Sequence, residues 1–288
     1  MAFLRNLLVR GKQQAEQASD SPAPVAATFA QSRLKVGWAT DVGAVRRHNE
    51  DTAMVVAAAH DGDGSLPPFG LFVLADGMGG HRSGEVASSL ASRVVAHRVV
   101  QRFYLPTLMS QERDTAQPAL NEVLIEAVRE ANTSVADHVP GGGTTLTCAL
   151  MVGSRAYVAH VGDSRAYVVT ESGLDQITHD HSLVDRLVEL GQLTEAEAAD
   201  HPQKNVLYRA VGQSGVLEVD TYVRTVPEGG FLLLCSDGLW GLVSEDEIKD
   251  IILDAASPQA ACKKLVDAAN RAGGRDNITA IIVEPPLG

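Results

Sequence analysis

The sequence has few cysteines and lacks both a long apolar run and a phosphate-binding loop. Its 288 residues include three Cys, an odd number without paired spacing, so we predict no disulfide framework and a reducing compartment. No apolar run approaches the roughly 20 residues needed to span a bilayer. No GxxxxGK segment occurs, which argues against a P-loop kinase or ATPase. The length fits one large domain or two small ones, and a core of useful size.

Basic residues are also in the minority. Lys and Arg number 24 against 36 Asp and Glu, so the formal net charge is −12. Because nucleic-acid backbones bind cationic surfaces, this balance argues against nucleic acid as the main partner. We therefore predict a cytoplasmic protein without a membrane span.

The first 33 residues differ in composition from the rest of the chain. Met1–Arg10 is apolar and basic, and the stretch that follows is rich in Gln, Ala, Ser and Pro. We predict a disordered tail over residues 1–33 and a folded domain over residues 34–288. A docking arm or a short helix on a membrane surface are the alternatives for the tail.

Apolar periodicity predicts several helices with short strands between them. Helices are expected over 84–103 and 118–139, after Ser244 with Glu247, and from Ser257 to Gly273. The β-type runs are 71–75, 144–152, 156–161, 165–170, 174–178, 231–235 and 278–284. The four runs from 144 to 178 are separated by short turns, which predicts an antiparallel meander. This order favours an α+β fold with helices outside antiparallel sheets.

Acidic residues stand at the ends of these apolar runs. Asp76, Asp163 and Asp237 follow apolar runs, Asp276 precedes one, and Glu50 with Asp51 precedes a shorter run. Any one of them could be only a turn former. If the strand ends converge, however, the acids repel one another unless they are protonated or neutralised by cations. No run of Lys or Arg accompanies them, and an all-oxygen set suits Mg²⁺ or Mn²⁺ rather than zinc.

The acids belong to a set of spaced motifs. These are Arg46-x-x-Asn49-Glu50-Asp51, Leu74-Ala-Asp-Gly-Met-Gly-Gly80, Gly143-Thr-Thr, Gly162-Asp-Ser-Arg165, Ser236-Asp-Gly238 and Gly274-Arg-Asp-Asn277. Together they resemble the metal-dependent Ser/Thr protein phosphatases of type 2C, in their bacterial form, over residues 34–284. The resemblance implies a four-layer α-β-β-α sandwich, in which two antiparallel sheets are flanked by helix pairs. The segment 179–212, with expected helices at 182–190 and 194–199, would be the family's variable flap.

The resemblance also implies a role for each motif residue. Asp76 would bridge two tightly bound ions, Mn²⁺ or Mg²⁺, with the Gly77 carbonyl on one of them. Asp237 and Asp276 would hold one ion, and Asp163 would help to hold a third, weaker ion. Glu50 and Asp51 would orient metal-bound waters or ligate directly. Arg46 would bind the substrate phosphate, and Arg46, Asp76 and Asp163 are the expected catalytic residues.

One position departs from the family pattern. Eukaryotic relatives often carry His two residues after the bridging Asp, where it is proposed to protonate the leaving alcohol, and here that residue is Met78. A metal-bound water is a candidate for the general acid. Trp240 and Cys235 are expected to pack in the core.

The predicted activity is hydrolysis of phosphoserine and phosphothreonine in proteins by a metal-bridging water. The expected partners are phosphorylated proteins, in particular a Ser/Thr kinase or its substrates, and the expected state is a monomer. A catalytically inactive phosphoprotein-binding relative is one alternative. A small-molecule phosphatase or a structural metal-binding domain is another.

Overall fold

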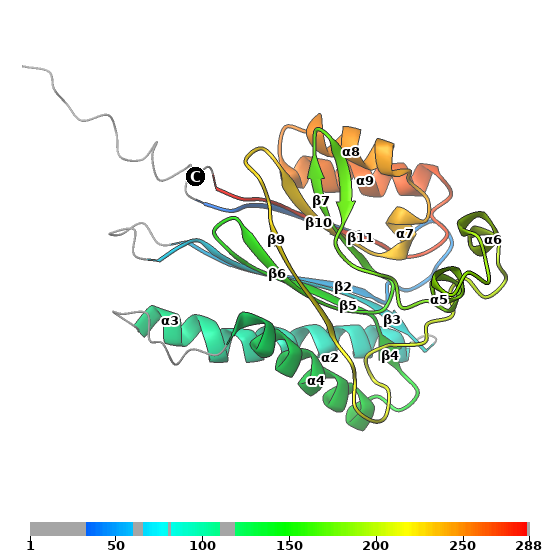
Figure 1. The fold of residues 1–288 in the computed structure, drawn as a ribbon, viewed down its shortest axis with the longest axis horizontal. Helices are drawn as coiled ribbons and strands as arrows, with labels where there is room; N and C mark the ends of the chain where they lie inside the picture. Colours follow the sequence, from blue (N-terminus) through cyan, green and yellow to red (C-terminus); the bar gives the residue numbers. More distant parts are fainter. Residues whose placement is uncertain (1–32, 60–65, 80–81, 110–118, 287–288) are drawn as a thin grey trace, which may run out of the picture. The chain divides into compact units, whose positions relative to one another are not determined.

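Two antiparallel sheets lie face to face in the computed structural model, which describes residues 33–59, 66–79, 82–109 and 119–286 (Figure 1). The first sheet has the order β1 (Lys35–Asp41), β11 (Ile278–Glu284), β10 (Phe231–Cys235), β7 (Arg165–Thr170) and β8 (Gly173–Gln176). The second has the order β2 (Asp51–Ala58), β3 (Phe69–Met78), β5 (Leu146–Val152), β6 (Arg155–Val161) and β9 (Asp220–Thr225), with β4 (Gly143–Thr144) paired to β3. The predicted tail lies outside the described residues, except for Arg33.

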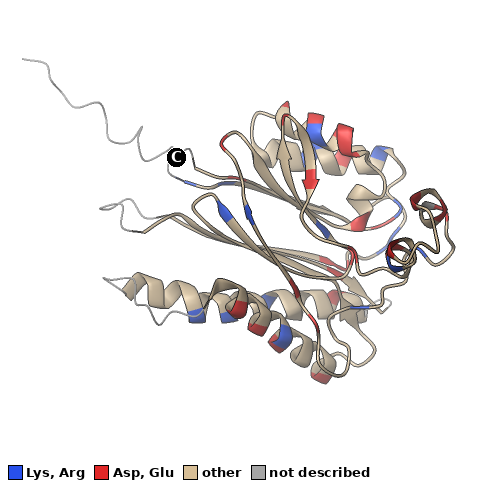
Figure 2. Cartoon of the chain, viewed as in Figure 1, with Lys and Arg blue, Asp and Glu red and all other residues tan. Residues whose placement is uncertain are grey.

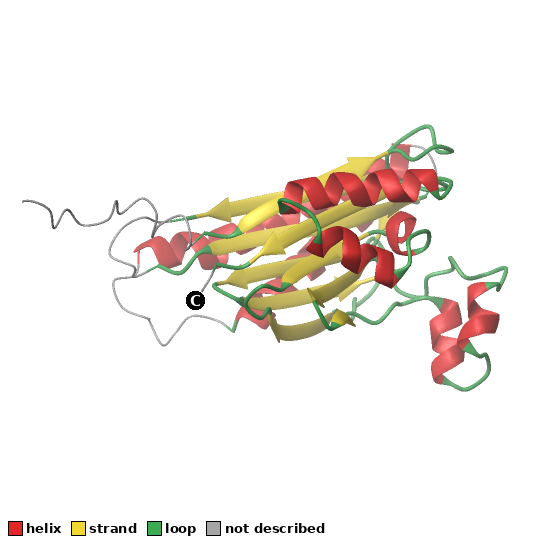
Figure 3. Cartoon of the chain, turned by 90° about the horizontal axis from the view of Figure 1, so that it is seen from above, coloured by secondary structure: helices red, strands yellow, loops and turns green. Residues whose placement is uncertain are grey.

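Helices cover the outer face of each sheet (Figures 1 and 3). The second sheet is covered by α2 (Arg82–Val99) and α4 (Leu120–His138); α2 continues through a π-helical turn, η1 (Val100–Tyr104), into α3 (Leu105–Met109). The first sheet is covered by α8 (Glu245–Leu253) and α9 (Pro258–Arg271), and α7 (Asp237–Trp240) follows β10 directly. The short helices α5 (Leu183–Glu189) and α6 (Glu195–Ala199) stand beyond one end of the strands. The predicted four-layer α-β-β-α sandwich is therefore confirmed.

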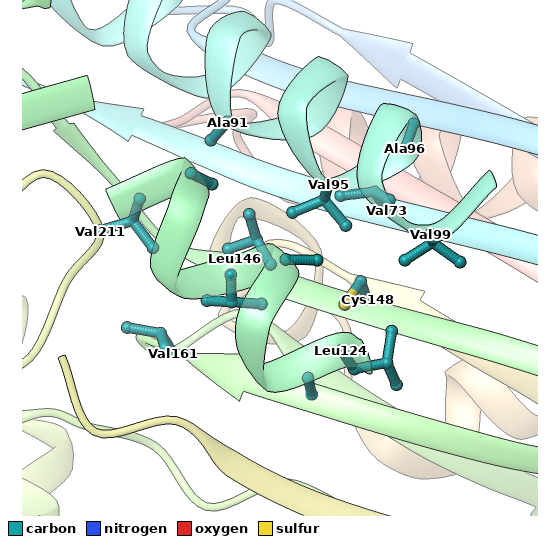
Figure 4. Close-up of a cluster of buried hydrophobic side chains, with 14 of the residues drawn as sticks. Val73, Ala91, Val95, Ala96, Val99, Leu124, Leu146, Cys148, Val161 and Val211 are labelled. Carbon is teal, nitrogen blue, oxygen red and sulfur yellow. The ribbon is translucent and has the colours of Figure 1, made fainter. Parts of the chain in front are cut away.

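The alternation of side chains along the strands produces three apolar layers. In β3, Leu71 and Val73 pack toward α2 and α4, while Phe72 and Leu74 pack against the other sheet. Figure 4 shows the layer below the second sheet, where Val73 meets side chains from both helices. Burying each such side chain contributes about 1.5–3 kcal/mol, so these layers fix the positions of the strand ends.

Serine caps begin the two C-terminal helices as expected. The Ser244 hydroxyl accepts a hydrogen bond from the Glu247 N–H at 3.3 Å, and the Ser257 hydroxyl accepts one from the Ala260 N–H at 3.2 Å. Gly273 ends the segment with a φ of +122°, a conformation that glycine adopts without strain.

The meander prediction was wrong. β5 pairs with β6, and β7 pairs with β8, but β6 and β7 belong to different sheets. The turn at residues 162–164 carries the chain from one sheet to the other, and Gly162 permits this with a φ of +113°. Asp163 consequently lies where the two sheets approach each other at one end.

All three cysteines, Cys148, Cys235 and Cys262, are buried and free, as expected from their spacing. Burial raises the pKa of Cys235 to about 12, so this thiol is an apolar packing group at neutral pH. Among the described residues, every helix is too short or too polar to span a bilayer.

Candidate active site

The predicted acidic residues meet at one end of the two sheets. Asp51 and Asp76 are cross-strand partners on β2 and β3. Asp237 is the first residue of α7, directly after β10, and Asp276 lies just before β11. Acidic segments gather at this end of the sheets beside α5 (Figure 2). The charges of the other four, Asp163 included, act on the Asp76 carboxyl.

Burial and mutual repulsion disfavour the charged forms of these carboxyls. Burial first, and then the charges of Asp51 and Asp237, hold the pKa of Asp76 well above its usual range. Burial raises the pKa of Asp51 to about 7, and burial with the charge of Asp276 raises that of Asp237 to about 6. Burial and the charge of Asp237 raise the pKa of Asp163. Such a cluster is costly at neutral pH unless cations neutralise it.

Two carboxylate oxygens in the cluster, Asp51 Oδ1 and Asp237 Oδ1, are buried and have no hydrogen-bond partner among the residues that the structure describes. The other oxygen of Asp51 accepts a hydrogen bond from the Ser236 hydroxyl at 2.8 Å. A buried polar atom without a partner destabilises the fold by about 1–3 kcal/mol, and more when it is charged. These oxygens are therefore suited to bind a cation.

The backbone at Asp76 and Gly77 is held in place. The Asp76 carbonyl accepts hydrogen bonds from the Thr145 N–H at 2.8 Å and the Thr144 hydroxyl at 2.9 Å. The Gly77 N–H donates to the Glu50 carbonyl at 3.1 Å. A Cβ atom on Gly77 would collide with the backbone carbonyls of Glu50 and Gly84. Only glycine fits here, which explains the Asp-Gly pair in physical terms.

The Glu50 carboxylate packs beside the start of α2. It fills the space that a side chain on Gly84 would need, in the first turn of α2. Its charge acts on Arg46 and is not among the main charges that act on Asp76. This position suits an indirect role better than direct ligation at the Asp76 carboxylate.

The donor set fits a hard divalent cation. The available atoms are carboxylate oxygens and backbone carbonyls, the ligands that Mg²⁺ and Mn²⁺ prefer. No group of three or more His, Cys, Asp or Glu side chains in the described part of the chain is spaced to hold a metal ion by itself. Water and a backbone carbonyl such as that of Gly77 would therefore have to complete the coordination.

Arg46 stands at the rim of the cluster. Its Nη2 contacts Asp276 Oδ2 at 2.6 Å, and its side chain is about half exposed, at 53%. The loop that carries it is fastened by Asn277, whose amide donates to the carbonyls of Val42 and His48, each at 3.0 Å. The hydrogen bond to Asp276 is the first cause of the raised pKa of Arg46. Arg47 is exposed on the same loop.

A groove connects the acidic cluster with the predicted flap. The cavity has a volume of about 960 Å³, and Asp163, Asp237 and Asp276 lie on its catalytic side. The flap contributes residues of α5 and α6, including Val188 and Glu195. The groove is large enough for a peptide segment rather than a single amino acid.

Comparison with known proteins identifies the family of this chain. Residues 56–268 match the model of the family Protein phosphatase 2C. The chain belongs to the protein phosphatase 2C family. It is accordingly an enzyme, a metal-dependent protein serine/threonine phosphatase of the bacterial type, and it acts on phosphorylated proteins.

Individual relatives agree over most of the chain. The serine/threonine phosphatase stp of Listeria monocytogenes is 38% identical over 251 residues, which are 86% of this chain and 94% of the relative. The solved structure of the serine/threonine phosphatase PstP/Ppp of Mycobacterium tuberculosis matches with a TM-score of 0.73 and 33% identity, covering 88% of this chain and 99% of that one. A structure of the PstP catalytic domain in complex with two manganese ions matches with a TM-score of 0.70 and 33% identity, covering 87% and 97%.

Trp240, which the sequence pattern assigned to the core, also lines the groove of this phosphatase 2C protein. It packs against the apolar layer between the first sheet and the helices α8 and α9. Its indole contacts the guanidinium of Arg165, whose Cζ lies 3.6 Å from the ring centroid. Arg165 in turn forms a bidentate ion pair with Asp180, with N–O distances of 2.9 to 3.1 Å. The proximity of Trp240 to Ser236-Asp237-Gly238 was the only sequence signal for this role.

Proposed function

We propose that this phosphatase hydrolyses phosphoserine and phosphothreonine with a carboxylate site that binds two divalent cations tightly and a third more weakly. In this proposal Asp76 serves both tight sites, with the Gly77 carbonyl on one of them. Asp237 and Asp276 serve one tight site, and Asp163 serves the weak site. Asp51 and Glu50 act through water, or Asp51 ligates directly. Mn²⁺ or Mg²⁺ fits all of these oxygen donors.

The observation that carries the proposal is the pair of buried, unpartnered oxygens on Asp51 and Asp237. They lie in a cluster where burial and neighbouring charges raise the pKa values of Asp51, Asp76, Asp163 and Asp237. A structural cluster would be expected to use both oxygens in hydrogen bonds. Cation binding explains why these do not.

Different residues of the chain bind different parts of the substrate. Divalent cations, when bound, supply Lewis-acid stabilisation of phosphoryl charge and an activated water nucleophile. Arg46 has donors beyond the one that contacts Asp276, and we assign these to the phosphate oxygens of the substrate. The groove beside the flap orients the peptide on both sides of the phosphorylated residue.

The leaving alkoxide needs a proton from a group other than residue 78. Met78 carries a thioether and has no proton to donate. We assign the proton donor to a water at the weak site beside Asp163, a residue that lines the groove together with Asp237.

We further propose that the enzyme acts in the cytoplasm, as a monomer, on a Ser/Thr kinase or on the substrates of such a kinase. The catalytic domain would comprise residues 34–288. Three free, buried cysteines support a reducing compartment.

A phosphopeptide panel assayed with and without Mn²⁺ tests the assignment. Wild-type protein should release phosphate from phosphoserine and phosphothreonine peptides only with the metal, and much faster than from free phosphoserine. Asp76→Asn should lose most turnover, whereas Asp175→Asn, at an exposed position on β8, should not. Equal turnover in Asp76→Asn and wild type would refute the assigned site. A preference for free phosphoserine would indicate a small-molecule phosphatase.

A further inference from the structure

The turn that carries Asp163 is held by a residue of the flap. His181, two residues into the flap, is buried with 2% of its surface exposed. Its ring Nδ1 lies 3.1 Å from the Gly162 N–H, and its own backbone N–H donates to the Gly162 carbonyl at 2.7 Å. Both polar backbone atoms of Gly162 are thus bound by a single residue from a distant part of the chain.

Gly162 has little freedom to move away from this contact. Its φ is +113°, and a Cβ atom there would lie 2.6 Å from side-chain atoms of Thr145. Because Asp163 is the next residue, the direction of the Asp163 side chain depends on where the Gly162 peptide is held. The imidazole therefore acts on Asp163 through one backbone hydrogen bond.

The contact requires one tautomer of the ring. A backbone N–H can only donate, so Nδ1 must carry no proton, and the proton of a neutral imidazole must then sit on Nε2. Nε2 lies 3.3 Å from Asp220 Oδ2, which can accept that proton in a hydrogen bond. Burial, and then the charge of Arg209, lower the pKa of His181, which agrees with a neutral ring.

The opposite edge of the His181 ring, which carries Nε2, lies beside Arg209 near the end of the flap. Arg209 Nη1 is 3.1 Å from His181 Nε2 and donates to Asp220 Oδ1 at 2.8 Å. The Tyr208 N–H donates to the His181 carbonyl at 3.0 Å, so segments near the two ends of the flap meet at this histidine. His160 lies against the same ring with a centroid distance of 4.9 Å.

We propose that His181 is a positioning residue. It links residues 208 and 209, near the end of the flap, to the turn that carries Asp163. This inference rests on the proposed role of Asp163. It assigns His181 no contact with substrate or metal. Its effect should fall on turnover rather than on substrate affinity, since Arg46, to which we assign the substrate phosphate, lies on a different loop and pairs with Asp276.

Two substitutions separate the two edges of the ring. His181→Asn places an amide near the Nδ1 position and keeps an acceptor for Gly162, whereas His181→Gln places its amide near the Nε2 position and leaves the Gly162 N–H without an acceptor. We expect His181→Gln to lower kcat on phosphopeptide roughly tenfold with KM within about twofold, because the Gly162 N–H then lacks the acceptor that holds the Asp163 turn in place. His181→Asn should recover most of the lost turnover. Equal losses in both variants, or none in His181→Gln, would overturn the proposal.

Two measurements on metal-free protein do not depend on catalysis. Amide hydrogen exchange at Gly162 should be faster in His181→Gln than in wild type and near wild type in His181→Asn. In the wild type at pH 7, nitrogen NMR shifts of His181 should report a neutral ring protonated at Nε2, and a ring protonated at Nδ1 would overturn the proposal even if His181→Gln fails to fold. Absence of Mn²⁺-dependent phosphatase activity in the wild type would instead refute the proposed function, while the exchange and NMR results would still test the contact.

Discussion

The indole Nε1 of Trp240 donates a hydrogen bond to the backbone carbonyl of Asp163 at 3.1 Å. This bond joins α7, which begins with Asp237, to the turn between the two sheets. Two acidic residues of the proposed site, far apart in sequence, are thereby fixed relative to each other.

Replacing Trp240 by Phe should remove this bond and keep most of the ring contact with Arg165. We expect kcat to fall roughly five- to tenfold, because a hydrogen bond of this kind contributes about 1 kcal/mol and holds Asp163 in place. Phosphopeptide kinetics at saturating Mn²⁺ measure this effect. Trp38→Phe, at a side chain that is 48% exposed on β1, is the matched control and should leave kcat unchanged. A Trp240→Phe enzyme with wild-type kcat would show that the bond does not serve catalysis.

Substitutions of Arg46 and of its neighbour Arg47 can be compared through their effects on KM. Arg46→Ala should raise KM for phosphopeptide roughly tenfold, because a bidentate guanidinium contact with phosphate is lost. Arg46→Lys should recover little, since a single ammonium cannot reproduce that geometry. Arg47→Ala should change KM by less than about twofold. Steady-state kinetics on one phosphopeptide suffice, and a larger effect from Arg47 would mean that the phosphate contact belongs to that residue.

Substitution of Asp163 should affect the weak metal site and leave the tight sites intact. Asp163→Ala is expected to remain folded and to lose most turnover on phosphopeptide. Calorimetric titration with Mn²⁺ should show the tight sites intact and the weak site absent. Full activity would show that Asp163 is only a turn residue. Loss of the tight sites would show that it ligates the two tightly bound ions directly.

The acidic cluster should destabilise the metal-free protein in a pH-dependent manner. The pKa of Asp237 is about 6 in the fold against 3.8 for the unfolded chain, so between these values the folded state binds more protons. Its stability must therefore fall as pH rises through 6. In EDTA, Asp237→Asn should be more stable than wild type by on the order of 3 kcal/mol at pH 8 and by about half of that at pH 5.

Urea unfolding at both pH values measures this difference. Asp175→Asn, at an exposed carboxylate, should show no such gap. Added Mn²⁺ should stabilise the wild type more than Asp237→Asn, because cation binding to the folded state adds to its free energy of unfolding. A wild-type protein more stable than Asp237→Asn in EDTA at pH 8 would contradict the proposed charge repulsion.

Apolar runs predicted most of the strands but not their pairing. β10 and β11 have the predicted bounds because both faces of each strand are buried, so nearly every residue is apolar. β1 and β9 were not predicted, because nearly all of their residues are exposed or half-buried and leave no apolar run. The turn at Gly162 has the sequence of a hairpin, yet it joins two sheets, and short-range spacing does not distinguish these outcomes.

The acidic residues could be predicted because each one borders an apolar run, and strand ends on one side of a fold meet. Trp240 and His181 could not be predicted in the same way. Their contacts with the Asp163 turn are to backbone atoms of residues 163 and 162, and such contacts depend on tertiary structure alone. The resemblance implied a role for the Gly77 carbonyl, but the collision that a side chain at Gly77 would make with Gly84 is visible only in three dimensions.

The pairing of β1 with β11 has a consequence for biosynthesis. The Thr40 and Thr279 hydroxyls, 2.8 Å apart, are separated by 239 residues of chain. β11 lies between β1 and β10, so the first sheet stays divided until the ribosome has released the segment that contains β11. Asp276 emerges with that segment. A nascent chain should therefore acquire metal affinity and phosphatase activity only after β11 has left the ribosome, and copies that lack β11 should be unable to dephosphorylate cellular proteins.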